Sequence, residues 1–241
     1  MVVDLEENSE MEHNDKPSRI LGFAFLFQFV TSLFNGAVLQ PAWLVPGDVR
    51  QTLMNIASHP ILVRASLLVD MLTALGIIFL GAILYETLME QNRKIALVAL
   101  GFYIMEAVLL ASSRLGAFSL IGIAREYQLS SQPATWLGMG NVAIGSMNFI
   151  GSTLHMLSFC SGGILFYYLL YRSRLVPPAL SLWGLITVIP CLAGTLATVF
   201  GIQVPIYFYA PYVPFELVIA IWILVKGIHR EPRPVPNPHL P

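Results

Sequence analysis

Six apolar runs, separated by short polar segments, leave few folds open to this chain. The runs lie at about residues 20–40, 61–85, 95–113, 141–171, 180–200 and 212–228. A helix needs about 20 mostly apolar residues to cross the hydrocarbon core of a bilayer, which is about 30 Å thick. Charged residues make up only 11% of the chain, against about 25% in a typical soluble domain. The sequence therefore predicts an all-α, polytopic membrane protein with six transmembrane helices.

Polar segments flank this apolar region on both sides. Residues 1–18 are acidic and lack the apolar stretch of a signal peptide, so we expect a disordered tail. Residues 230–241 alternate proline too densely for a helix and form a second, Pro-rich tail. Residues 19–229 are then a single transmembrane domain. Cys160 and Cys191 each lie inside an apolar run and are predicted to be free, buried thiols.

Lysine and arginine are distributed unevenly between the two sides of the predicted bundle. The chain has 13 of them, and all but Arg50, Arg64, Arg114 and Arg125 fall on the side that also holds both tails. Cytoplasmic loops carry an excess of these residues. We therefore expect a multi-pass protein of the cell membrane (the plasma or inner membrane) with both termini in the cytoplasm.

The segment between the first two spans carries a helix start signal. Asp48 is followed three residues later by Gln51, a pair that resembles a capping box, and Pro60 marks the end of the segment. We predict a short helix at about 49–57, lying at the outer interface. The apolar side chains expected to face lipid or protein are Leu53, Met54 and Ile56.

Three blocks of sequence resemble a known family. They are "PGDVRQTLMNIASHPILVRASLLVDML", "LLYRSRLVPPALSLWGLI" and "PFELVIAIWILVKG". These blocks are similar to an uncharacterised bacterial membrane family, domain of unknown function 4386, and the resemblance extends from Arg19 to Gly227. It implies a six-helix bacterial membrane protein. It implies no activity and transfers no catalytic residues.

Ionisable side chains within the predicted spans are the candidates for a site. Such groups are costly in hydrocarbon and usually face the bundle interior or a wet cavity. Polar residues recur at spacings of three and four in each of the first four spans, so each span has one polar face. We expect these faces to enclose a polar interior that opens outward. The ligand-binding candidates are Arg64, Asp70, Glu106, Arg114, Asn148, His155 and Glu216.

Structural roles remain open for the same residues. Asp70 forms either a structural ion pair with Arg64 or Arg114, or part of a functional site. Glu216 stands in the first turn of its predicted helix, where the helix dipole favours an acid. Glu106 has no near partner on its own helix, so it is either protonated or paired with another helix. A lone His155 is more often an interior hydrogen-bonding residue than a ligand.

The sequence predicts no cofactor, no metal site and no catalytic residue. Metal-binding HExxH and CxxC motifs and nucleotide-binding loops are missing or out of context. "FCSGG" places Ser161 on the fourth span, but a serine protease needs a histidine base nearby, and the last span offers none. A net charge of −1 without a basic patch gives no indication of nucleic-acid binding.

Three functions are compatible with these patterns. The first is binding or carriage of a small or amphipathic molecule, or a lipid, in the polar interior. The second is an accessory or assembly subunit whose polar faces contact a membrane protein partner. The third and least favoured is an intramembrane enzyme that uses Glu106 or His155. In every case the lipid bilayer is a partner.

Overall fold

The computed structural model describes residues 19–228, and every regular element in that range is helical. Both predicted tails lie outside the described residues. Five stretches are long and apolar enough to cross a bilayer: Arg19–Ala42, Pro60–Leu129, Pro133–Ser173, Pro178–Val199 and Ile206–Lys226. The second stretch is 70 residues long and is bent in its middle, so the five provide the six predicted crossings.

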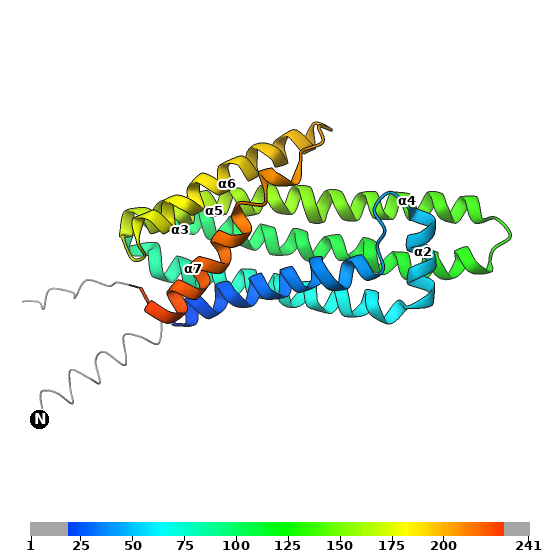
Figure 1. Ribbon diagram of the computed structural model, residues 1–241, viewed down its shortest axis with the longest axis horizontal. Helices are drawn as coiled ribbons and strands as arrows, with labels where there is room; N and C mark the ends of the chain where they lie inside the picture. Colours follow the sequence, from blue (N-terminus) through cyan, green and yellow to red (C-terminus); the bar gives the residue numbers. More distant parts are fainter. Residues whose placement is uncertain (1–18, 229–241) are drawn as a thin grey trace, which may run out of the picture.

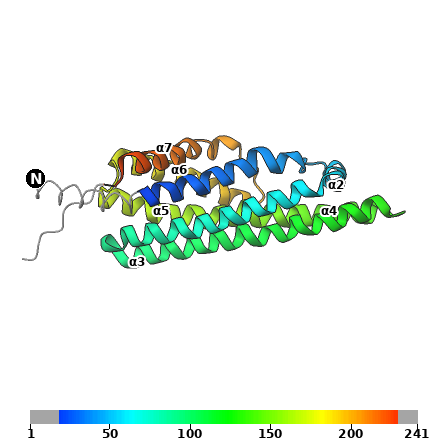
Figure 2. The ribbon, with the colours of Figure 1, turned by 90° about the horizontal axis from the view of Figure 1, so that it is seen from below.

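α3 (Pro60–Leu129) is a helical hairpin whose two arms meet at Asn92 (Figures 1 and 2). The backbone of Asn92 is extended, with φ −163° and ψ 102°. Its side-chain Oδ1 accepts a hydrogen bond of 3.1 Å from the Ile95 amide. Asparagine is a favoured N-cap because its side chain satisfies a free amide of the first turn. The polar segment 90–94 thus reverses the chain within a very tight turn.

The remaining long helices pack against this hairpin. The first helix, residues 19–34, continues into the π-helix η1 (Asn35–Leu39) and the 3-10 turn η2 (Gln40–Ala42). α4 (Pro133–Asn148) continues through the π-helix η3 (Phe149–Leu154) into α5 (His155–Ser173). α6 (Pro178–Val199), the 3-10 turn η4 (Ile206–Phe208) and α7 (Tyr212–Lys226) complete the bundle.

The first helix and α7 approach each other closely, although they are at opposite ends of the sequence. A Cβ added at Gly22 would lie 2.5 Å from the backbone nitrogen of Leu224. Small residues permit such backbone contact between membrane helices. The two helices also lie side by side in Figures 1 and 2. The sixth span is thereby anchored to the first.

The helices differ greatly in length, so the molecule is longer than a bilayer is thick. At 1.5 Å per residue, α6 is about 33 Å long, whereas the second arm of α3, residues 93–129, is about 55 Å long. We call the end that holds Asn92 and Lys226 the tail end, and the opposite end the α2 end. The connection between α6 and α7 lies about halfway between them (Figure 1). Beyond that level the bundle continues without α6 and α7.

The predicted short helix is present as α2 (Val49–Ser58). Asp48 caps it by accepting a hydrogen bond of 2.8 Å from the Gln51 amide. The reciprocal half of a capping box is replaced, because the Gln51 side chain bonds Asn55 at 2.9 Å instead. Leu53 and Ile56 are fully buried, whereas Met54 is exposed, so α2 packs on protein through one face.

A separate apolar core holds the α2 end together. It joins Trp43 and α2 to the start of α3, the end of α3 and α4, and its fully buried members include Trp43, Leu53, Val63 and Leu120. Residues 114–140, which fall between the predicted third and fourth spans, form two helices that continue those spans. They are joined by a short connection at residues 130–132. A larger core holds the other helices together toward the tail end.

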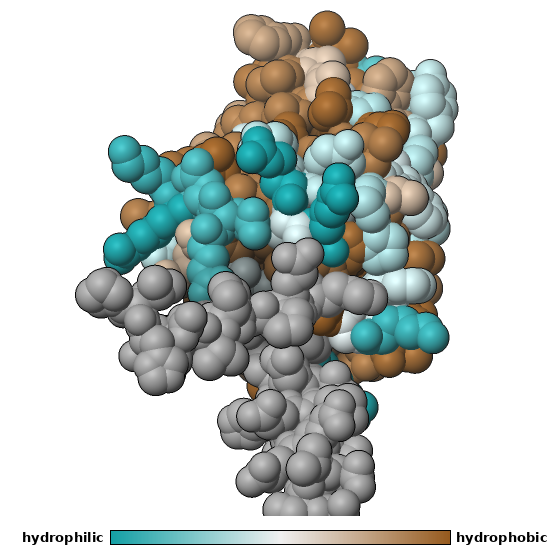
Figure 3. Space-filling view, turned by 90° about the vertical axis from the view of Figure 1, so that its left-hand side faces the viewer, coloured by the Kyte–Doolittle hydropathy of each residue, from teal (hydrophilic) through white to brown (hydrophobic). Residues whose placement is uncertain are grey.

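Positive charge gathers at the tail end. The described lysines and arginines there are Arg19, Arg93, Lys94, Arg172, Arg174 and Lys226. Figure 3 views the molecule from this end and shows hydrophilic side chains gathered on it, with apolar side chains around them. Cys160 and Cys191 are buried and free, as predicted.

Candidate functional site

A polar cavity of about 150 Å³ lies where the first helix, the two arms of α3 and the α4–η3–α5 helix meet. Its exposed lining residues lie on the first helix, η1, α4 and η3, so the cavity opens between these elements. Buried side chains of α3 form its floor. Its lining residues are Ser32, Asn35, Gly36, Gln40, Asp70, Leu110, Arg114, Met147, Asn148, Gly151, Ser152 and His155.

Both π-helical segments of the described chain border this cavity. η1 contributes Asn35 and Gly36, and η3 contributes Gly151 and Ser152. π-helices are rare, usually occur as single turns within α-helices, and are frequent at functional sites. Their wider turn alters which side chains face the interior on either side of it. Two such turns therefore lie on opposite walls of one cavity.

The floor of the cavity carries an ion pair between the two arms of α3. Asp70 Oδ2 lies 3.1 Å from Arg114 Nη1, and both side chains are almost completely buried. The pairing is incomplete, because among residues 19–228 neither of these two atoms has a hydrogen-bond partner of good geometry, and neither does Arg114 Nε. The sequence offers both Arg64 and Arg114 as partners of Asp70, and in the structure the partner is Arg114.

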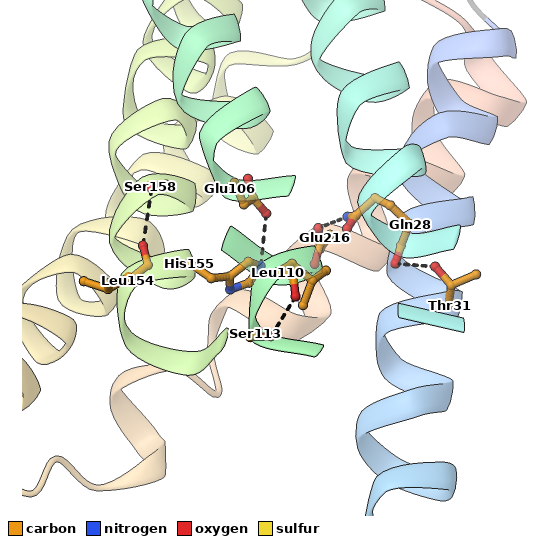
Figure 4. Close-up of polar contacts among 9 residues, drawn as sticks. All are labelled: Gln28, Thr31, Glu106, Leu110, Ser113, Leu154, His155, Ser158 and Glu216. Atoms are coloured by element: carbon orange, nitrogen blue, oxygen red, sulfur yellow. Dashed lines mark hydrogen bonds and ion pairs between the residues drawn. The ribbon is translucent and has the colours of Figure 1, made fainter. Parts of the chain in front are cut away.

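A second pair lies deeper in the bundle. Glu106 Oε1 is 3.5 Å from Nε2 of His155, which joins α3 to α5 (Figure 4). Within the described chain, Glu106 Oε2 and His155 Nδ1 have no hydrogen-bond partner. His155 lines the cavity and Glu106 lies behind it. Glu106 is thus paired with a residue of another helix, which is one of the two possibilities that the sequence leaves open.

Glu216 belongs to a different polar contact. Its Oε1 accepts a hydrogen bond from Gln28 Nε2, which links α7 to the first helix (Figure 4). Nearby, the hydroxyl of Tyr212 on α7 is hydrogen-bonded to the hydroxyl of Tyr167 on α5. Glu216 does not line the cavity. The sequence places Glu216 in the first turn of its helix, and this is wrong: α7 begins at Tyr212, its first turn holds no acid, and the partner of Glu216 is the Gln28 side chain.

Two more candidate residues lie at or outside the rim. Asn148 is exposed and lines the mouth of the cavity, whereas Arg64 is exposed and does not line it. The small and polar face expected along the fourth span points inward at His155 and Gly162, but Asn141, Gly145, Asn148 and Ser152 are exposed. α6 reaches η3 but does not pack on α4, which contacts α2 and α3, so this face of α4 has no neighbouring helix.

Sequence reasoning did not single out several residues that shape the site. Asn35 is one of them: it is buried, lines the cavity and accepts a hydrogen bond of 2.6 Å from Ser66. Gly151 lies so close to α3 that an added Cβ would be 2.6 Å from Ser113 Oγ and 3.1 Å from Arg114 Nη2. No local sequence signal marks Gly151, because its role depends on a contact between distant segments.

The depth of these groups follows from helix geometry. Asp70 and Arg114 each lie 22 residues from Asn92 along their arms, which corresponds to about 33 Å from the tail end. Glu106 lies about 21 Å along the second arm, and Glu216 about 15 Å from Lys226. A hydrocarbon core of about 30 Å that starts at the tail end would place the ion pair at its far boundary. Asp70 would then lie near the boundary of the hydrocarbon core, whereas the apolar residues on both sides of it in the sequence predict a deeper position.

The described residues offer no group of three His, Cys, Asp or Glu side chains arranged to hold a metal ion.

A second cavity, of about 300 Å³, lies between α6 and the η4 region. It is lined almost entirely by apolar groups, and its lining includes no acidic, basic or cysteine side chain. Its lining residues are Ile186, Thr187, Pro190, Tyr207, Phe208 and Pro211.

Comparison with known proteins identifies one related group. The model of a family described as "Domain of unknown function (DUF4386)" matches residues 20–227. No curated protein matches the chain, and no solved structure matches it either.

Proposed function

The chain belongs to the DUF4386 family of membrane proteins, and from that premise we propose that it binds or carries a small polar or amphipathic molecule in the cavity between η1 and η3. One observation supports this above all others. Ionisable side chains at the cavity, namely those of Asp70, Arg114 and His155, have buried polar atoms without hydrogen-bond partners in the described chain. A buried polar atom left unpaired is costly, and more so when it is charged. A ligand in the cavity would supply the missing partners.

The charge distribution supports an orientation for this site. Loops rich in lysine and arginine stay in the cytoplasm, and the tail end carries six such residues in the described chain. We infer that the tail end faces the cytoplasm in a cell membrane and that the cavity opens near the outer face. A ligand would therefore arrive from outside or from the outer leaflet.

Native mass spectrometry of the protein in mild detergent tests this function directly. We expect a bound molecule in stoichiometric amount, and we expect Asn148→Leu to reduce its occupancy at least tenfold. Asn148 is exposed at the mouth, so a leucine there blocks the cavity without disturbing the core. The matched control is Asn141→Leu, two turns earlier on the same helix, exposed and outside the cavity.

The outcomes separate the hypotheses. Loss of the bound molecule in Asn148→Leu but not in Asn141→Leu supports a binding protein. Equal occupancy in both variants would contradict it. Co-purification of a second membrane protein, lost only when the polar contacts are changed, would favour an accessory subunit instead.

A further inference from the structure

The mouth of the cavity faces sideways rather than along the axis of the bundle. Its exposed lining residues, Ser32, Gly36, Asn148 and Ser152, come from two walls that run along the length of the molecule. In Figure 1 the first helix and the α4–α5 helix run along the bundle with α3 behind them. Large exposed apolar side chains stand beside the mouth on both walls: Leu33 and Phe34 on the first helix, and Phe149 on η3. A sideways opening with apolar borders gives access to the bilayer.

The depth of the floor matches the depth of a lipid headgroup. The Asp70–Arg114 pair lies about 33 Å from the tail end along α3, and a hydrocarbon core is about 30 Å thick. The connection between α6 and α7 lies near the same level of the bundle (Figure 1). Acyl chains next to the apolar borders would therefore lead up to a headgroup beside the ion pair.

The floor presents one charge of each sign to this space. An anionic headgroup would gain from Arg114 but be repelled by Asp70, and a cationic headgroup would meet the reverse. A zwitterion can place its anionic group near Arg114 and its cationic group near Asp70 together. The atoms it would engage are Arg114 Nε and Nη1 and Asp70 Oδ2, none of which has a hydrogen-bond partner among residues 19–228. A group that satisfies both charges relieves the penalty of an imperfectly paired buried ion pair.

We propose that the cavity binds a zwitterionic headgroup, an oxyanion joined to an ammonium, carried by a phospholipid that enters sideways between η1 and η3. This inference rests on the proposed function and specifies its ligand. The phosphate lies against Arg114 and the amine against Asp70. Asn148 and Ser152, at the rim, are placed to contact the glycerol region.

The test is a lipid titration of the delipidated full chain, followed by native mass spectrometry. The lipids share identical oleoyl chains and differ in headgroup: phosphatidylethanolamine, phosphatidylglycerol and a trimethylammonium lipid. Free glycerophosphoethanolamine is titrated in parallel. We expect saturable one-to-one binding of phosphatidylethanolamine, at least tenfold tighter than either singly charged lipid. Weaker binding of the free headgroup identifies the lipid as the source, whereas equal binding supports the same chemistry from a soluble zwitterion.

Two charge variants provide a second readout that depends on a ratio rather than on total binding. Asp70→Asn removes the negative charge, so only the positive charge of Arg114 remains at the floor. The lipid preference should then shift at least tenfold toward phosphatidylglycerol. Arg114→Gln leaves only the negative charge and should shift the preference toward the trimethylammonium lipid. Arg64→Gln, exposed and outside the cavity, is the charge control and should shift nothing. If the variants do not fold, the ranking of lipids by the wild-type protein still decides the inference.

Failure of this inference and failure of the proposed function look different. If the wild-type protein binds all three lipids equally, or prefers a singly charged one, the zwitterion inference is overturned. The binding function stands in that case as long as Asn148→Leu still blocks occupancy by some molecule. If Asn148→Leu blocks nothing, both are overturned.

Discussion

Asp70 and Arg114 illustrate how one buried contact can serve both stability and recognition. They stand at equal distances from Asn92 on the two arms of α3, so the turn at Asn92 fixes which acid meets which base. Their ion pair is short but poorly aligned for hydrogen bonding.

Removing one partner of this pair should destabilise the protein. Arg114→Gln leaves Asp70 as an uncompensated buried charge, a change that costs about 3 kcal/mol in comparable pairs. The double variant Asp70→Leu with Arg114→Met should recover most of that loss, because apolar residues of similar volume often replace buried pairs at little cost. Denaturant unfolding in detergent measures both. A single variant as stable as the wild-type protein would show that the pair is solvated.

Gly151 sets the distance between η3 and α3. An alanine there meets Ser113 Oγ at 2.6 Å, and overpacking of this kind typically costs about 1–3 kcal/mol. Gly145→Ala is the matched control, because nothing lies within 4 Å of its added Cβ, and alanine is the better helix former. Thermal unfolding should rank Gly151→Ala below the wild-type protein and Gly145→Ala at or above it. The reverse ranking would contradict this packing.

At the scale of elements, α2 is a local structure that fastens the α2 end. Asp48→Ala removes its N-cap, which we expect to cost about 1 kcal/mol and to loosen the first turn of α2. Hydrogen exchange should show faster exchange of the Gln51 amide, which bonds Asp48, with little change in the arms of α3. Arg50→Ala, exposed on the same turn, serves as the control. Unchanged exchange in Asp48→Ala would exclude the cap as the cause of order there.

The sequence predicts elements better than it predicts contacts between them. Six spans and α2 follow from apolar run length and from the Asp48 signal, because both depend on neighbouring residues. Apolar run length does not set the start of α4 at Pro133, because residues there pack on α2 and α3. The π-helices carry no local signal, and the pairing of Glu106 with His155 depends on how two distant helices are rotated.

At the scale of the whole molecule, the uneven helix lengths and the charge distribution support the orientation that we propose for the protein in a membrane. The α2 end continues beyond the level at which α6 and α7 turn back (Figure 1). Leu53 and Trp43 are buried in its own apolar core. We infer that this end is a small extramembrane cap built on extensions of the membrane helices.

Cysteine labelling tests that arrangement. In a background with Cys160→Ala and Cys191→Ser, single cysteines replace Lys94 and Arg174 at the tail end, or Arg50 and Gln132 at the α2 end. A membrane-impermeant maleimide applied to intact cells should label the second pair and leave the first pair unlabelled until the cells are lysed. Labelling of the first pair in intact cells would reverse the inferred orientation.

The π-helical segments also have a genetic consequence. In an uninterrupted α-helix, inserting one residue rotates everything beyond it by about 100°, which would misplace an entire packed face. A π-turn absorbs the extra residue locally, so the flanking helix keeps its contacts. A one-codon deletion within residues 35–39 or 149–154 should therefore leave the bundle intact and rebuild one wall of the cavity. Relatives that lack one residue at either of these two places would then keep the same fold. Their cavity wall would differ, and so would the ligand that they bind.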